Sequence, residues 1–282
     1  MIRNALTVDV EDYFHVTAFA GTISRNDWDN YPLRVVNSTR RLLELFDSCG
    51  VRATFFILGW VAERLPDLVR EIAAQGHEVA CHGYSHQLVY NQTPGEFRAE
   101  TLRSKALLED IIQAPVLGYR AASYSITGRS LWALDVLAEA GFSYDSSIFP
   151  VRHDRYGIPG SPEFPHELKT PAGHALVEFP LSTARVLGFR LPVAGGGYFR
   201  LYPYRLTKFG LSQINKMNRP FIFYLHPWEI DPGQPRVPAS LLSRFRHYNN
   251  LDKCESRLRR LMEDFSFDTA RAVLAENELV GA

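Results

Sequence analysis

The stretch Gly76-His77-Glu78-Val79-Ala80-Cys81-His82-Gly83-Tyr84-Ser85-His86 carries the clearest structural signal in the chain. Its first part is a short apolar run that predicts a β-strand, and two histidines four residues apart follow directly. Neutral imidazoles are common ligands of divalent metals, so this spacing indicates a metal site at the end of a strand. On a helix the same spacing often only brings two polar side chains together, so the interpretation depends on a second segment.

That second segment lies near the start of the chain. Leu6-Thr7-Val8-Asp9-Val10-Glu11-Asp12 is a mostly apolar predicted strand that ends in three carboxylates. Two histidines and one carboxylate, with another carboxylate left free, are the groups of a hydrolytic metal centre. The alternative is that the acidic residues form only a solvated turn.

Strand-like and helix-like segments alternate along most of the chain, and a capping box with proline at the first helical position, Thr93-Pro94-Gly95-Glu96, opens one of the helices. Expected strands cover residues 5–10, 52–58, the run before His82, 115–119, 142–145 and 220–225. Expected helices cover residues 37–49, 62–75, 94–112 and 129–140. This alternation predicts βαβ units and a parallel sheet, most simply an α/β barrel.

The alternation breaks between about residues 150 and 205, which are rich in proline and glycine. We expect a long insertion there with short strands, such as residues 177–179, and a charged helical tail over residues 239–279. A chain of 282 residues is within the size range of one α/β barrel. The prediction is therefore a single domain over residues 1–282, an irregular (β/α) barrel with an insertion at about 150–205 and a helical C-terminal tail.

Composition excludes several classes of protein. The 31 basic residues balance 31 acidic ones, so no basic surface favours a nucleic-acid partner. The three cysteines are scattered, which fits a reducing compartment better than a disulfide framework. No apolar stretch is long enough to span a bilayer, and no signal peptide is visible before the first strand. We expect a soluble cytoplasmic protein, and the oligomeric state stays open.

Chemically capable residues recur at or just past the ends of the predicted strands. They are Asp9, His82, Arg120, Asp145 and His226. In a (β/α) barrel the carboxyl ends of the strands carry the active site. Ordinary alternatives exist, since arginines mostly form surface ion pairs and aspartates often cap turns. His226 is the hardest to explain structurally, because it ends a strongly apolar strand.

Taken together, these segments resemble the polysaccharide deacetylase family, also known as the NodB homology domain or carbohydrate esterase family 4. The resemblance covers most of residues 4–230. The matching motifs are Thr7-Val8-Asp9, Gly76-His77-Glu78-Val79 with His82-Gly83-Tyr84-Ser85-His86, Arg120-Ala121-Ala122-Ser123-Tyr124, Tyr144-Asp145-Ser146-Ser147 and Leu225-His226. The run from Asp9 to Phe14 and the long insertion are most similar to the subgroup found with bacterial exopolysaccharide biosynthesis.

The resemblance implies a role for each motif. Asp9 would be the general base, paired with Arg120, and His226 the general acid, oriented by Asp145. His82 and His86 would bind a divalent metal ion, with zinc the expected ion. A backbone N–H near Tyr124 would help to stabilise the oxyanion.

The main departure from the family pattern is Val10, which stands where the metal-binding aspartate is usual. Side chains two apart in a strand point to the same face, so Glu11 can share a site with Asp9. Asp12 can reach the same site if the strand ends in a bend. The alternation favours Glu11 as the third metal ligand, with Asp12 as the alternative.

The activity implied by the resemblance is hydrolysis of the N-acetyl group of an amino sugar in a polysaccharide or its precursor. A carbohydrate is thus the expected partner, with faces for its rings offered by aromatic residues such as Tyr124, Tyr198, Phe199 and Trp228. Two other classes stay open: a metal-independent C–N hydrolase on the same scaffold, and a carbohydrate-binding barrel without turnover. Metal analysis separates the first alternative, and a deacetylation assay separates the second.

Overall fold

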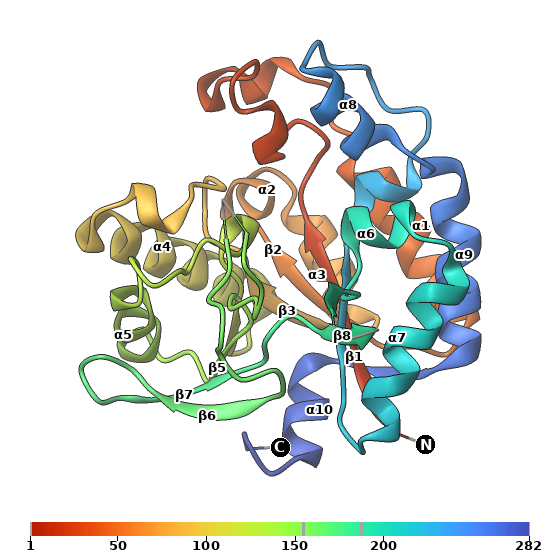
Figure 1. The fold of residues 1–282 in the computed structure, drawn as a ribbon. Coiled ribbons are helices and arrows are strands. Elements are labelled where there is room, and N and C mark those ends of the chain that lie inside the picture. The colour runs from red at the N-terminus through yellow and green to blue at the C-terminus, as the bar shows by residue number, and fades with distance from the viewer. Residues whose placement is uncertain (1, 154–155, 187–188, 282) are drawn as a thin grey trace.

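A computed structural model describes residues 2–153, 156–186 and 189–281, and Figure 1 shows strands at the centre with helices around them. The strands are β1 (Arg3–Val10), β2 (Thr54–Ile57), β3 (Glu78–Cys81), β4 (Gly118–Tyr119), β5 (Tyr144–Asp145), β6 (His166–Lys169), β7 (Ala175–Glu178), β8 (Thr183–Val186), β9 (Phe189–Pro192), β10 (Ile222–Leu225) and β11 (Ser266–Asp268). The α-helices are α1 (Val35–Ser48), α2 (Gly59–Arg64), α3 (Pro66–Ala74), α4 (Pro94–Ile112), α5 (Trp132–Glu139), α6 (Gly196–Leu201), α7 (Tyr204–Lys216), α8 (Leu241–Tyr248), α9 (Leu251–Asp264) and α10 (Ala270–Glu276). The short 3-10 helices are η1 (Thr17–Phe19), η2 (Arg25–Asn30), η3 (Val89–Asn91), η4 (Ala122–Tyr124) and η5 (Pro227–Ile230).

The main sheet has the strand order β10-β1-β2-β3-β4-β5-β7-β6, with β11 paired to the first half of β1. All of these pairings are parallel except that of β6 with β7. The parallel order confirms the expected α/β class, and the carboxyl ends of β1 to β5 and β10 therefore meet on one side. The hairpin of β8 and β9 forms a separate two-stranded sheet.

Irregular backbone, rather than a further strand, continues the sheet at the outer edge of β10. The Tyr224 N–H donates to the Ala194 carbonyl at 2.7 Å, and Gly195 forms a parallel bridge with Tyr224. Gly195 has a φ of +125°, and a Cβ atom there would lie 1.9 Å from the Tyr224 oxygen. Only glycine satisfies both conditions, so this position lets the chain approach β10 closely.

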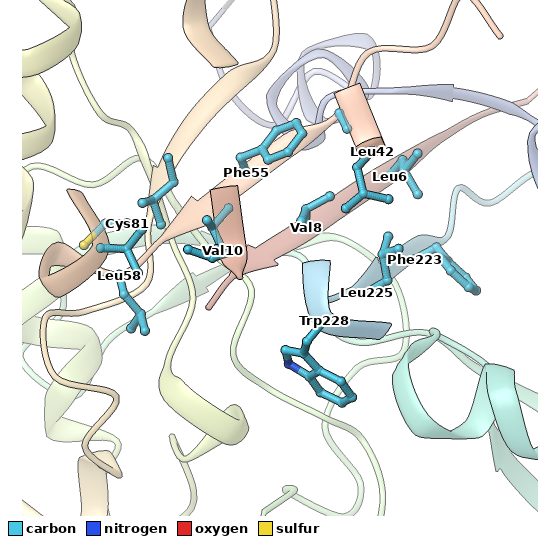
Figure 2. Packing of buried hydrophobic residues seen from close by; sticks show 14 of the residues in the cluster. Leu6, Val8, Val10, Leu42, Phe55, Leu58, Cys81, Phe223, Leu225 and Trp228 are labelled. Carbon is cyan, nitrogen blue, oxygen red and sulfur yellow. The ribbon is translucent and has the colours of Figure 1, made fainter. Parts of the chain in front are cut away.

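Successive side chains of β1 point alternately to the hydrophobic core and to the opposite face of the strand. Leu6, Val8 and Val10 are fully buried in the larger hydrophobic cluster, and Figure 2 shows them with Phe55 and Leu42. Residues two apart share a face of a strand, so Thr7 and Asp9 point to the opposite side, into the barrel. The strand that builds the core therefore also delivers an acidic side chain to the interior.

The structure corrects some element boundaries. The helix expected over residues 62–75 is two helices, because Pro66 begins α3 and the preceding Leu65 leaves the helical conformation with a φ of −131°. The segment at 150–205 is more than a surface insertion, since β7 pairs with β5 in the main sheet. The tail is helical, as expected, with the short strand β11 within it. Within the described ranges, every helix is too short or too polar to cross a membrane.

Candidate active site

Three predicted ligands meet where β1 and β3 end. Glu11, His82 and His86 each offer one ligand atom, and these atoms all lie within 4.8 Å of one another. Glu11 Oε2 is 3.0 Å from His86 Nε2. A tight turn follows β1, in which the Glu11 N–H donates to the Asp9 carbonyl at 3.0 Å. This turn brings the Glu11 carboxylate to the same side as Asp9.

The loop that carries both histidines is held on two sides. His82 Nδ1 lies 2.8 Å from the Arg120 carbonyl, which can only accept, so Nδ1 carries the proton and Nε2 is left for a ligand. Gly83 has a φ of +72° and its carbonyl accepts the Gly59 N–H at the start of α2. His86 itself adopts a left-handed φ of +50°, a conformation that is uncommon for non-glycine residues.

The residues of this cluster fit a divalent cation. Apart from its 3.0 Å contact with His86 Nε2, the buried Glu11 Oε2 has no polar partner among the described residues. Burial opposes ionisation of Glu11, but the charges of His86 and His226 outweigh it and hold the pKa of this carboxyl well below its usual range. Burial lowers the pKa of His82 to about 4, so its imidazole is neutral. A carboxylate with two imidazoles is a donor set that zinc accepts.

Asp12 does not join this cluster. Its Oδ2 accepts the N–H groups of Arg34 and Val35 at the start of α1, at 2.6 and 2.8 Å, and its Oδ1 accepts the Tyr13 N–H. Burial raises the pKa of Asp12 to about 6, against the effect of these hydrogen bonds. The structure therefore places Asp12 outside the metal-ligand cluster, because Oδ2 bonds the start of α1 and Oδ1 bonds the neighbouring Tyr13 N–H.

Asp9 and Arg120 form the buried ion pair expected of a base and its partner. Arg120 Nη1 donates to Asp9 Oδ1 at 2.6 Å and to the Thr7 hydroxyl at 2.8 Å. The rest of the guanidinium donates to Ser146 and lies 4.1 Å from the centre of the Phe56 ring. Burial disfavours the charge on Arg120, but Asp9 outweighs it and raises the arginine pKa. Asp9 is thereby fixed with Oδ2 turned toward the end of β10.

His226 follows β10 and faces both acidic residues of the β1 end. Its Nε2 is 3.3 Å from Glu11 Oε1 and 4.0 Å from Asp9 Oδ2. Its Nδ1 lies 2.8 Å from Glu229 Oε1, and its backbone N–H donates to the same oxygen. Burial disfavours the imidazolium, but Glu11 and Glu229 together raise the pKa of His226 to about 9. The ring is therefore protonated at neutral pH.

The carboxylate behind His226 is thus Glu229, and not Asp145 as the resemblance implied. Glu229 Oε2 accepts from Arg200 Nε at 2.5 Å in a fully buried ion pair. Burial alone would raise the pKa of Glu229, but Arg200 and His226 lower it to about 2. The other guanidinium nitrogens of Arg200 donate to the carbonyls of Arg246, His247 and Asn249, at the C-terminal end of α8.

Asp145 has a different environment. Its Oδ1 accepts the Ser147 hydroxyl at 2.5 Å, and it lies beside Glu178 of β7. Burial raises the pKa of Asp145 to about 6, and burial with the Asp145 charge raises the pKa of Glu178 well above its usual range. The Asp145–Glu178 pair therefore retains a proton. The two side chains link β5 to β7 in the main sheet.

A cavity of about 390 Å³ opens above these groups. Asp9, Glu11, His82, His86 and His226 line it together with a wall of aromatic rings, namely Tyr90, Tyr124, His153, Tyr156, Tyr198, Tyr224, Trp228 and Phe245. Tyr124 follows Ser123, and both have left-handed φ values, +54° and +49°. The Tyr124 N–H donates to the Ala121 carbonyl at 3.0 Å, so it is already used inside a turn. Phe199, also expected at a sugar face, lies in the core instead.

Glu229 and Arg200 were not among the site residues predicted from the sequence. A signal for Glu229 existed, because His226-Pro227-Trp228-Glu229 has the spacing of a capping box with proline at the first position, and the structure forms that box. Arg200 carried no comparable signal, since it lies in α6, within the segment expected to be an insertion.

Comparisons with known proteins match two family descriptions along the chain. Residues 27–144 match the family described as polysaccharide deacetylase. Residues 146–275 match a domain of unknown function, DUF3473. His226, Glu229 and Arg200 all fall within this second region.

Two curated relatives have named activities. A peptidoglycan-N-acetylglucosamine deacetylase from Bacillus cereus is 28% identical over 148 residues, which are 48% of this chain and 52% of the relative. A chitooligosaccharide deacetylase from a Bradyrhizobium species is 31% identical over 100 residues, covering 36% of this chain and 43% of the relative. The chain thus spans only about half the length of each of these two relatives.

Solved structures share the fold over almost the whole chain. A candidate polysaccharide deacetylase from Mycobacterium smegmatis has a TM-score of 0.62 at 19% identity, covering 98% of this chain and 92% of that one. The Puue allantoinase has the same TM-score at 15% identity, covering 99% and 90%. At such identities the likeness concerns the fold alone. Residues 27–144 therefore match the polysaccharide deacetylase family, and almost the whole chain shares the fold of these solved structures.

Proposed function

We propose that this protein hydrolyses the N-acetyl group of an acetylated amino sugar, releasing acetate and a free amine. The observation that carries the proposal is the meeting of three chemical units at one cavity: the Glu11–His82–His86 cluster, the Asp9–Arg120 pair and the protonated His226. Each unit matches one requirement of amide hydrolysis, namely electrophilic activation, a base and an acid. The two deacetylase relatives support the same reaction class.

Asp9 acts as the general base in this proposal. Arg120 holds its Oδ1 in place and leaves Oδ2 to accept a proton from the attacking water. Asp9 lines the cavity and is only 2% exposed.

His226 acts as the general acid. Glu229 holds Nδ1, so Nε2 is directed at the cavity and carries the proton that the departing amine needs. Arg200 neutralises the second oxygen of Glu229 and fixes its orientation. We assign Glu229 and Arg200 as positioning residues, because neither contacts the space where the substrate would lie as directly as His226 does.

Glu11, His82 and His86 would hold a divalent ion, with zinc the proposed metal. Such an ion, when bound, polarises the amide carbonyl and lowers the pKa of water. The His82 Nδ1–H to Arg120 bond would fix the ring for this role, since outer hydrogen bonds of this kind orient ligand imidazoles.

The aromatic wall supports a saccharide as substrate. Tyr124 and Tyr198 are proposed to contact sugar rings, whose C–H faces pack on aromatic side chains. The sequence resemblance adds the proposal of a role in bacterial exopolysaccharide biosynthesis. Three free cysteines, Cys49, Cys81 and Cys254, support a cytoplasmic location.

The test is acetate release from N-acetylated glucosamine oligosaccharides, measured together with metal content. Asp9→Asn and His226→Ala are expected to keep the metal and lose about 10²–10⁴-fold in rate, the usual contribution of a general base or acid. Leu102→Ser, at an exposed leucine of α4 outside the cavity, is the control. Full activity of either site variant would refute the assignment of its residue, and no acetate release by the wild type on any such oligosaccharide would refute the proposed reaction.

A further inference from the structure

Helix α8 exposes an apolar face to solvent. Leu241 is 83% exposed, Leu242 58% and Phe245 55%. Their spacing places them on one side of the helix, while His247 on the other side is buried. Single exposed leucines are common on soluble proteins, but three on eight residues of helix form a cluster that requires an explanation.

The same segment is basic. Residues 232–251 contain three arginines, at 236, 244 and 246, and no aspartate or glutamate. Arg244 and Arg246 are exposed, and neither takes part in an ion pair with any residue of the described ranges. Arg236 lies over the Tyr248 ring at 4.2 Å, which fixes it at the same surface.

This surface adjoins the mouth of the catalytic cavity. Phe245 and Arg246 line the cavity, as does Leu201 of α6, which is also exposed. In Figure 1, α8 lies at the end of the molecule opposite the two termini. We call Leu201, Leu241, Leu242, Phe245, Arg244 and Arg246 the α8 surface.

We propose that the α8 surface docks on an anionic membrane surface. Exposed arginines are attracted to acidic lipid headgroups, and leucine and phenylalanine side chains insert at the boundary of headgroups and acyl chains. Leu241 and Leu242 lie outside the cavity and are highly exposed, so they project outward and suit a fluid interface better than a rigid protein groove. Docking in this way turns the cavity mouth toward the headgroup layer. The proposal does not depend on the deacetylase activity.

The test is sedimentation of the full-length protein with phosphatidylcholine vesicles that either contain or lack phosphatidylglycerol. The wild type is expected to bind the anionic vesicles and to be released at high salt, because salt screens the arginine attraction. Arg244→Ala should lower the partition coefficient about fivefold, the effect of one basic residue near an anionic surface. Leu241→Ser/Leu242→Ser should lower it further while acetate release from soluble oligosaccharide stays unchanged, since neither leucine lines the cavity.

The matched control is Phe209→Ser/Met217→Ser, which removes two comparably exposed apolar side chains from the α7 region. This variant should bind vesicles like the wild type. Equal binding by the leucine variant and the wild type, or no binding by the wild type, would overturn the proposal. So would a wild-type dimer that the leucine variant abolishes, without vesicle binding, because the α8 surface would then join two copies of the chain.

Discussion

Glu11 and Asp12 are neighbouring buried carboxylates whose partners give them different functions. Glu11 faces two imidazoles, whereas Asp12 accepts three backbone N–H groups, two of them at the start of α1. Strand alternation was enough to favour Glu11 from the sequence. It could not show what Asp12 does, because two of the three N–H groups that Asp12 accepts come from a segment more than twenty residues further along the chain.

These environments predict opposite effects of two conservative substitutions. Glu11→Gln should lower metal affinity at least about tenfold, because it removes the anionic ligand. Asp12→Asn should leave metal affinity unchanged and destabilise the fold by about 1–3 kcal/mol, because its amide would face N–H donors. Metal titration and denaturant unfolding of both variants check this, and the reverse ranking of metal affinities would assign the ligand to Asp12.

The contact between Glu229 and His226 gives a second prediction at the scale of residues. Glu229→Gln should reduce kcat by up to about 10²-fold, because His226 loses the anion that orients it and balances its charge. KM and metal content should change little, since Glu229 contacts neither the cavity mouth nor the metal cluster. Steady-state kinetics with metal analysis is the measurement. Asp145→Asn is the comparison, and a selective kcat loss in that variant instead would return the orienting role to Asp145.

At the scale of elements, the early strands and helices could be predicted because the sequence of each segment carries its own pattern. The apolar run of β2, the capping box of α4 and the glycine after α1 all agree with the structure. The region after residue 150 could not be assigned in the same way. There β7 joins the sheet and α6 supplies Arg200, and both results depend on contacts with distant segments that no local pattern encodes.

Gly195 tests the approach of this region to β10. Gly195→Ala should destabilise the protein by several kcal/mol or prevent folding, since the new Cβ would collide with the Tyr224 carbonyl in a conformation that also disfavours side chains. Gly128→Ala is the control, because nothing lies within 4 Å of a Cβ there. The measurement is thermal unfolding of both variants. Equal melting temperatures would show that the close approach to β10 is not required.

At the scale of the whole molecule, buried neutral histidines should make stability depend on pH. His77 accepts the Ala53 N–H through Nδ1, and burial lowers its pKa to about 4. The unfolded chain binds a proton near its ordinary pKa of about 6.5, so it takes up more protons than the folded state between these values. Stability should therefore fall as the pH drops from about 6.5 to 4.

His77→Asn should weaken this dependence, because the amide oxygen can replace Nδ1 as acceptor without titrating. Denaturation midpoints of the wild type and this variant from pH 4 to 8 provide the comparison. The wild-type curve should be the steeper of the two below pH 6.5. Parallel curves would mean that His77 does not contribute to acid destabilisation.

The most direct test of the central claim is acetate release before chelation, after chelation and after addition of Zn²⁺. We expect chelation to abolish turnover and Zn²⁺ to restore it in the wild type. The same concentration of Zn²⁺ should fail to restore turnover in Glu11→Gln. Turnover of an N-acetylated oligosaccharide that survives complete metal removal would contradict the account and identify a metal-independent C–N hydrolase on this fold.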